Sequence, residues 1–195
     1  MNLGQLRDLA RFRLQDVEKP YLWPTDFINA ALNEAQQEAC MRARLIEDLS
    51  SSLTEVDVTT TSKRYALDPR ILDVICIERS DGTRASGWTL TESELVFDDL
   101  PNLAETLWLT VIRLPMEDMA DDNDEPEIRP ALHQKLVDWV LHRCYEVNDA
   151  DGLNMGASEK YEAQFSRSFG IRQDFNVQRK HRDKGGRTVR IESGW

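Results

Sequence analysis

The sequence has few cysteines and histidines, and their positions argue against several kinds of site. Among 195 residues there are three cysteines and three histidines. Cys40, Cys76 and Cys144 lie far apart without CxxC spacing, which argues against a disulfide framework or a zinc site and indicates a reducing compartment. His133 and His142 are about 2.5 turns apart on an expected helix, and therefore on opposite faces. They cannot share a metal ion.

The sequence also lacks long hydrophobic runs and the common catalytic motifs. No apolar run approaches the roughly 20 residues that cross a bilayer, and the charged N-terminus is not typical of a signal peptide. GxGxxG, GxxxxGK[ST] and GxSxG are absent, so nucleotide binding and serine hydrolysis have no motif support. We expect a soluble, non-enzymatic protein that is made in a cytoplasm and has no cofactor, metal or membrane partner.

Basic residues are outnumbered over most of the chain but not at its end. The formal net charge is −11 and the isoelectric point about 4.8. Residues 171–195 hold seven Lys/Arg and three Asp/Glu, a net charge of +4, which leaves −15 for residues 1–170. This acidic body disfavours wrapping of nucleic acid, because it repels phosphates.

Apolar residues recur with a helical period in the segments 3–17, 25–48, 130–147 and 154–169, which predicts four helices. Gly170 is expected to cap the last of them.

Between the second and third expected helices the apolar period changes to two. Residues 53–114 therefore predict short antiparallel strands, with a hairpin signal at Asp81-Gly82 and the clearest strand at 106–114. We predict a mainly α (α+β) fold: a helical bundle over residues 1–170 with a small antiparallel β unit inserted at about 53–114. An extended basic arm, 171–195, follows it.

An acidic loop, MEDMADDNDEPEIRP, precedes the third helix. Its spacing Asp121-x-Asn123-x-Glu125 resembles a calcium loop, but Pro126 and Leu132 stand where an EF-hand needs glycine and glutamate. Carboxylates in an exposed loop also lack the burial that makes a proton donor for hydrolysis. A solvated loop is the better interpretation.

The arm ends in HRDKGGRTVRIESGW, which reads as a single strand after the hinge Gly185-Gly186. Val189 and Ile191 share one face, and an isolated strand of this kind can add to a sheet edge of another protein. Its basic residues allow nucleic-acid contact as an alternative, and a disordered terminus is a third. Trp195 favours docking, since tryptophan is enriched among the residues that dominate interfaces.

The order of these segments resembles the head–tail connector (adaptor, or head-completion) proteins of tailed bacteriophages. The resemblance covers most of the chain. It lies in LRDLARFRLQDVEKPYLWPTDFINAALNEAQQEA, in the strand segments RYALDPRILDVICIER and LWLTVIRLP, and in PALHQKLVDWVLHRCYEVNDAD with EKYEAQFSRSFGIRQ.

This resemblance implies a structural virion protein that forms a ring, typically a dodecamer, below the portal and joins the capsid to a tail or nozzle protein. DNA would pass through its lumen without specific binding, and C-terminal segments would reach the portal. The expected portal-binding residues are Arg187, Thr188, Val189, Arg190, Ile191 and Trp195. Candidates for a neighbouring-subunit or tail-facing loop are Asp121, Asp122, Asp124 and Glu125. A DNA-binding assembly factor and a tail-associated hydrolase are the alternatives.

Overall fold

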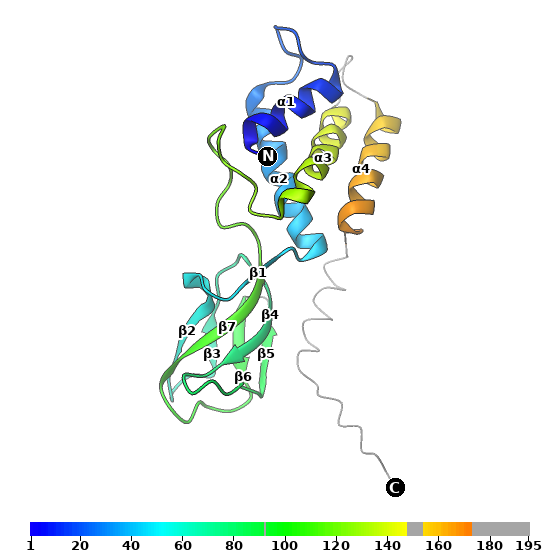
Figure 1. Ribbon diagram of the computed structural model, residues 1–195. Helices are drawn as coiled ribbons and strands as arrows, with labels where there is room; N and C mark the ends of the chain where they lie inside the picture. Colours follow the sequence, from blue (N-terminus) through cyan, green and yellow to red (C-terminus); the bar gives the residue numbers. More distant parts are fainter. Residues whose placement is uncertain (92, 148–153, 173–195) are drawn as a thin grey trace. The chain divides into compact units, whose positions relative to one another are not determined.

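The computed structural model describes residues 1–91, 93–147 and 154–172, which form two compact units. The helical unit combines Met1–Ile46 with Leu114–Arg172. The β unit is formed by Glu47–Arg113. Figure 1 shows the helices and strands with their labels.

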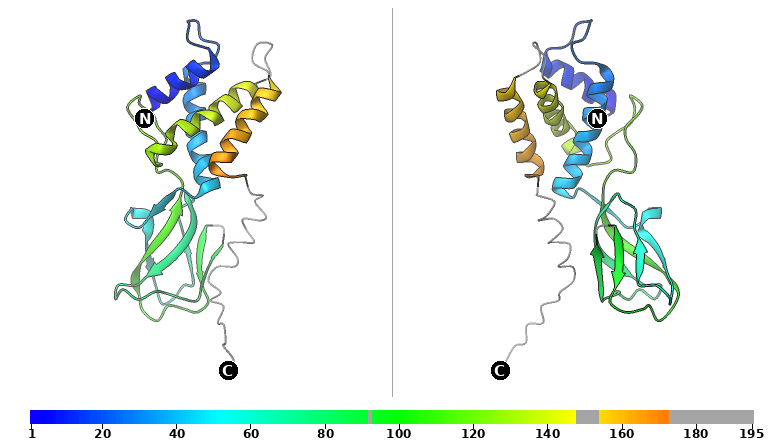
Figure 2. Two further views of the ribbon diagram at one scale, coloured as in Figure 1. Left: turned by 45° about the vertical axis from the view of Figure 1, so that its right-hand side comes forward. Right: turned by 180° about the vertical axis from the view of Figure 1, so that it is seen from behind.

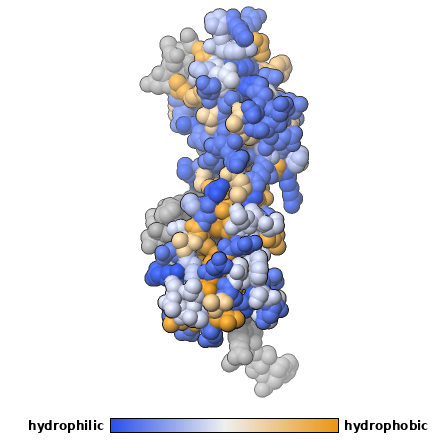
Figure 3. All heavy atoms as spheres, turned by 90° about the vertical axis from the view of Figure 1, so that its left-hand side faces the viewer, coloured by the Kyte–Doolittle hydropathy of each residue, from blue (hydrophilic) through white to orange (hydrophobic). Residues whose placement is uncertain are grey.

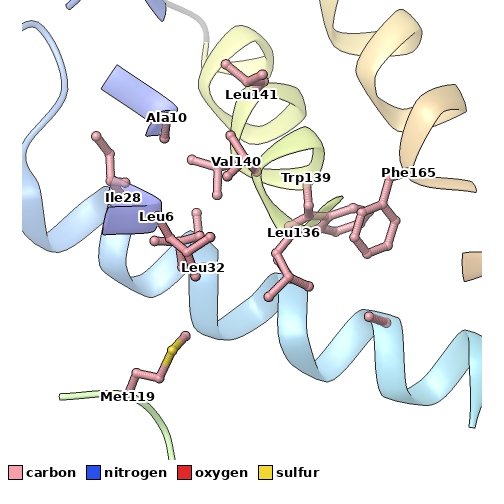
Figure 4. Packing of buried hydrophobic residues seen from close by; sticks show 14 of the residues in the cluster. Leu6, Ala10, Ile28, Leu32, Met119, Leu136, Trp139, Val140, Leu141 and Phe165 are labelled. Atoms are coloured by element: carbon pink, nitrogen blue, oxygen red, sulfur yellow. The ribbon is translucent and has the colours of Figure 1, made fainter. Parts of the chain in front are cut away.

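The helical unit contains α1 (Leu3–Leu14), α2 (Thr25–Ala43), α3 (His133–Glu146) and α4 (Met155–Phe169). A 3-10 turn, η2 (Pro130–Leu132), leads into α3. Apolar faces of all four helices meet in one core, to which Leu6, Leu32 and Trp139 contribute (Figure 4).

Local signals explain where these helices begin and end. The Asn2 side chain accepts a hydrogen bond from the Gln5 amide at 2.9 Å, and the Gln5 side chain accepts one from the Asn2 amide, which is a capping box at the start of α1. Gly170 ends α4 at a φ of 91°, as predicted, with its amide bonded to the Ser166 carbonyl. The prediction that the second helix runs to about residue 48 is wrong. It ends at Ala43 because Arg44 adopts a left-handed conformation.

The β unit contains two antiparallel sheets in the described part of the chain. In the first, β7 (Glu105–Arg113) pairs with β1 (Ile46–Asp48), β2 (Glu55–Val58) and β4 (Ile71–Glu78). A short 3-10 turn, η1 (Ser52–Thr54), precedes β2.

The second sheet has the order β3 (Arg64–Ala66), β6 (Glu94–Phe97), β5 (Trp88–Thr91). Leu107, Leu109 and Val111 of β7 are buried while Trp108 between them is 40% exposed, which confirms the alternation predicted for this part of the strand. The alternation ends at Ile112, which is buried as well. The turn at Asp81-Gly82 is also confirmed, since the Arg79 amide bonds to the Thr83 carbonyl and Gly82 has a φ of 79°.

The prediction of a mainly α fold is wrong. Helix accounts for 40% and strand for 22% of the described residues, and the strands form two antiparallel sheets, so the fold is α+β. The physical reason is that the strands bury a separate core containing Val58, Ile77, Leu95 and Leu109, and so do not act as a small insert in a helical bundle. Figure 2 shows the strand-rich unit from two further directions.

Arg42, near the end of α2, joins three helices from inside the helical unit. Its side chain is 3% exposed; Nε donates to Glu38 at 2.9 Å, and Nη1 donates to Glu162 at 3.1 Å and to Ser166 at 2.9 Å. The guanidinium carbon also lies 5.1 Å from the ring centroids of Trp139 and Phe165. Such a group is stable in a core only while its partners remain in place.

Asp48 has an equivalent position in the β unit. Its carboxylate is buried, pairs with buried Arg113 of β7 and accepts the amide hydrogens of Ser50 and Ser51 at 3.0 and 3.1 Å. Burial raises the pKa of this carboxyl, but the hydrogen bonds from Ser50, Ser51 and Arg113 outweigh it and hold the pKa well below its usual range.

Replacing Arg42 with methionine should lower the free energy of unfolding of the helical unit by about 3–5 kcal/mol, because buried Glu38 loses its closest cation. Arg143→Met is the matched control: Arg143 is 40% exposed in its ion pairs with Glu34 and Glu146, and its loss should cost less than about 1 kcal/mol. Hydrogen exchange of the α3 amides measures both values. Equal effects of the two substitutions would contradict a structural role for Arg42.

Asp48→Asn should destabilise the β unit by about 2 kcal/mol at pH 7, and this difference should shrink in acid. The folded pKa lies below the unfolded value of about 3.9. The stabilisation by the ionised carboxylate is therefore complete above that value and is lost as the pH falls through the folded pKa. The measurement is hydrogen exchange of the β7 amides between pH 7 and pH 3, with exposed Asp99→Asn as control. A pH-independent difference would contradict this assignment.

Candidate functional site

The acidic loop 116–129 belongs to the helical unit and is tied to the first turn of α1. The amide of Leu3 donates to the Asp124 carbonyl at 2.8 Å, and the amide of Gly4 donates to the Asp122 carbonyl at 3.0 Å. These amides belong to the helix's first turn and have no partner inside the helix. A Cβ on Gly4 would lie 3.3 Å from the Asp122 carbonyl oxygen, so a small residue permits this close approach.

Two of the predicted loop carboxylates hold the loop in shape. Both Nη groups of Arg7 donate hydrogen bonds to the Asp122 carboxylate, at 2.8 and 3.0 Å, and these bonds lower the pKa of Asp122. Asp124 accepts the amide hydrogens of Asp121 and Ala120, both at 2.8 Å, and these bonds lower the pKa of Asp124.

Other contacts fix the loop against α2. Asn33 and the main chain of Met119 exchange two hydrogen bonds, at 3.0 and 2.9 Å. The amide of Glu127 donates to the Gln36 side chain at 2.8 Å. Met119 is buried beside the α2 side of the core (Figure 4). The loop is therefore an ordered surface, in which the backbone positions that carry the outward carboxylates are fixed.

The remaining carboxylates of the loop face solvent. Asp121 and Glu125 are exposed, as are Glu117 and Asp118, the last of which accepts a hydrogen bond from Gln37 at 3.0 Å. Of the four residues predicted for subunit or tail contact, Asp121 is exposed, and Glu125 is exposed with its carboxylate 3.8 Å from the Met1 ammonium. Asp122 is already paired with Arg7, and Asp124 binds two amides of the loop.

His133 and His142 do not take part in a metal cluster of described residues. Nε2 of buried His133 lies 2.9 Å from the Ile128 carbonyl oxygen. The ring of His142 is tilted against that of Trp139, with the centroids 5.0 Å apart, and its Nδ1 bonds to the Ser158 hydroxyl. Across residues 1–91, 93–147 and 154–172, no group of three or more His, Cys, Asp or Glu side chains is arranged to hold a metal ion. In the same ranges no helix is both long and apolar enough to cross a membrane.

A basic groove lies between α1, α3 and α4 of the helical unit. Its volume is about 590 Å³. Its lining residues are Arg13, Lys135, Asp138, Lys160, Tyr161, Gln164, Arg167 and Ser168. Arg13 donates to Asp138 at 2.8 Å, so the carboxylate in this lining already has a cation. The groove was not predicted from the sequence, because its basic residues come from three separate helices. The local signal was the pair Lys160 and Arg167, two turns apart on one helix.

The β unit has a smaller cavity, of about 290 Å³, and several exposed apolar side chains. The cavity is lined by residues of both charges, including Arg79, Asp98 and Glu105, together with apolar Phe97 and Leu107. Figure 3 shows hydrophobic residues reaching the surface of the strand-rich unit. The exposed ones are Leu49, Ile75, Leu100, Leu103 and Trp108.

The predicted portal-binding residues Arg187, Thr188, Val189, Arg190, Ile191 and Trp195 lie outside the described residues.

Replacing Asp124 with alanine should loosen the acidic loop locally. The amides of Ala120 and Asp121 lose their acceptor, so their hydrogen exchange should accelerate by roughly tenfold. Glu117→Ala, which removes an exposed carboxylate of the same loop, should leave these rates unchanged. If Asp124→Ala exchanges like the control, this carboxylate does not hold the loop.

Comparison with known proteins identifies the family. The family model for SU10 adaptor protein matches residues 1–191. No curated protein matches the chain significantly. The match confirms the resemblance to phage head–tail adaptors that the order of the sequence segments indicated. The chain therefore belongs to the SU10 adaptor protein family, a family of structural adaptors that act in phage particles through contacts with other virion components.

Proposed function

We propose that this protein forms a homo-oligomeric ring, a dodecamer by resemblance, below the portal at the capsid–tail junction. The ring joins the capsid to a tail or nozzle protein and continues the channel through which DNA is packaged and ejected. The observation that carries the proposal is the match of the SU10 adaptor family over residues 1–191. The protein is made in the host cytoplasm and is incorporated into the virion as the head is completed.

The charge distribution supports a channel role. Residues 1–170 carry a net charge of −15. A surface of this sign at the lumen repels phosphates, so DNA slides past it without specific binding. The ordered acidic loop, with Asp121 and Glu125 exposed, offers a fixed surface to a neighbouring subunit or to the tail.

The C-terminal arm is the proposed portal contact. In its last residues, Val189 and Ile191 alternate with Thr188 and Arg190, the pattern of a strand that adds to the sheet edge of a partner. Arg187 and Trp195 flank this strand; the tryptophan supplies a large apolar anchor. Main-chain pairing on the portal offsets the entropy that the arm loses on binding.

The proposal is tested by co-sedimentation with portal rings of the same phage. Full-length protein should bind in a fixed ratio, whereas protein that ends at Gly170 should bind at least about tenfold more weakly, because it lacks the strand. Full-length Val189→Asp/Ile191→Asp should behave like the truncation, and Thr188→Ser should bind normally.

Two results would contradict parts of this proposal. Unchanged binding after truncation removes the arm from the portal contact. Failure of the full-length protein to bind portal rings, together with a salt-dependent shift of DNA that requires residues 171–195, favours a DNA-binding assembly factor, the function that the basic tail would also allow.

A further inference from the structure

The basic groove between α1, α3 and α4 concentrates positive charge on an acidic molecule. Its lining holds four cations and one carboxylate, and Arg13 already pairs with that carboxylate, Asp138, at 2.8 Å. Lys135 and Arg167 are exposed and have no hydrogen bond or ion pair with any described residue. Lys160 is exposed as well, with its ammonium 5.3 Å from the Tyr161 ring centroid. The groove therefore has a net charge of +3, against the sign of the body around it.

The lining fits a segment that carries carboxylates better than it fits an apolar ligand. The volume of about 590 Å³ is bordered by polar Gln164 and Ser168 and by Tyr161, between the charged side chains. Lysine and arginine side chains form their strongest hydrogen bonds with ionised oxygen acceptors. A groove that focuses one sign of charge also raises the local concentration of a partner of opposite sign.

The chain itself contains a segment of this kind. Residues 116–127 hold seven Asp and Glu residues, and all of them except Asp124 are exposed. Asp122 and Glu127 already accept hydrogen bonds from Arg7 and from the Met116 amide, which leaves Glu117, Asp118, Asp121 and Glu125. The loop is already held by its bonds to α1 and α2, so binding costs little conformational entropy.

The positions of the two surfaces prevent a copy from filling its own groove. The views in Figures 1 and 2 agree that the acidic loop and α4, the far wall of the groove, lie on opposite sides of the helical unit. Two different surfaces that complement each other from opposite sides make a head-to-tail contact, and repeated head-to-tail contacts close into a ring when the rotation between copies permits.

We propose that the basic groove receives the acidic loop of a neighbouring copy, and that this contact joins successive subunits. The inference rests on the proposed ring and names the surfaces that build it. Lys135, Lys160 and Arg167 bind the exposed carboxylates of the neighbour, while Asp122 and Asp124 keep the loop in its shape.

Zero-length carbodiimide crosslinking of portal-bound protein tests the contact directly, because it links an amine to a carboxylate only when they touch. We expect crosslinks from Lys135 or Lys160 to Glu117, Asp118, Asp121 or Glu125. Rings assembled from a mixture of ¹⁴N- and ¹⁵N-labelled protein should give mixed-isotope pairs, which shows that the link joins two copies. Portal-bound protein with no such pair would overturn the proposal.

A charge swap provides a second, independent test. Lys135→Glu/Arg167→Glu reverses the sign of the charge in the groove. Glu117→Lys/Asp121→Lys reverses the charge of two exposed loop residues and leaves Asp122 and Asp124, which hold the loop in shape, unchanged. Each pair should reduce assembly on portal rings by about tenfold or more, since like charges then face each other. The protein with all four substitutions should recover most of the assembly.

Lys19→Glu/Arg84→Glu is the matched control, because it changes the net charge by the same amount at exposed residues outside the groove. It should assemble like wild-type protein. Loss of assembly in this control, or no recovery in the fourfold variant, would show that net charge and not the groove decides the result.

The outcomes separate this inference from the proposed function. If groove variants bind portal rings in the normal ratio, the adaptor function stands and the groove contact is wrong. If wild-type protein does not bind portal rings, self-association of the free variants is measured by sedimentation velocity at millimolar concentration. Self-association that is lost in each double variant and regained in the fourfold variant supports the contact. If the fourfold variant does not regain self-association, the proposed contact is wrong. If the groove variants instead lose binding to duplex DNA and no crosslink forms, the groove binds phosphates and the proposal is overturned.

Discussion

The helical unit depends on one buried cation. Arg42 of α2 donates to Glu38 on its own helix and to Glu162 and Ser166 on α4, and its guanidinium lies near the ring of Trp139 on α3. A buried charge with incomplete partners is costly, so this group favours the single arrangement in which all three helices satisfy it. The same arrangement places α3 beside α4 and so forms two walls of the basic groove. Packing inside the unit thus determines the charge pattern on its outside.

A second constraint acts where α1 begins. The free amides of its first turn bind the carbonyls of Asp122 and Asp124, residues more than a hundred positions later in the chain. Helix capping usually involves residues close in sequence, but here it joins the start of α1 to a distant loop. The capping bonds therefore hold the charged loop as an ordered surface. An ordered surface suits a member of the adaptor family, because an adaptor acts through contacts with other virion components.

The sequence predicted what local patterns determine. The helical periods, the turn at Asp81-Gly82, the alternation along β7 and the cap at Gly170 were all readable, because neighbouring residues decide them. The end of α2 at Ala43 was not, since the apolar period continues past it, and pairing of β1 with β7 decides the conformation there. Neither the separate core of the β unit nor the basic groove was predicted, because both depend on residues from distant segments that meet after folding.

The way in which the acidic loop is held has a consequence for how such a protein can evolve. Its shape depends on main-chain carbonyls, on Arg7 with Asp122, and on the turn closed by Asp124. The side chains of Glu117, Asp121 and Glu125 accept none of the hydrogen bonds that shape the loop, and they face outward. Substitutions at these three positions can therefore change the charge and polarity of the outer face of the loop with almost no loss of folding stability. The same fold can thus adapt to a partner whose surface changes during evolution.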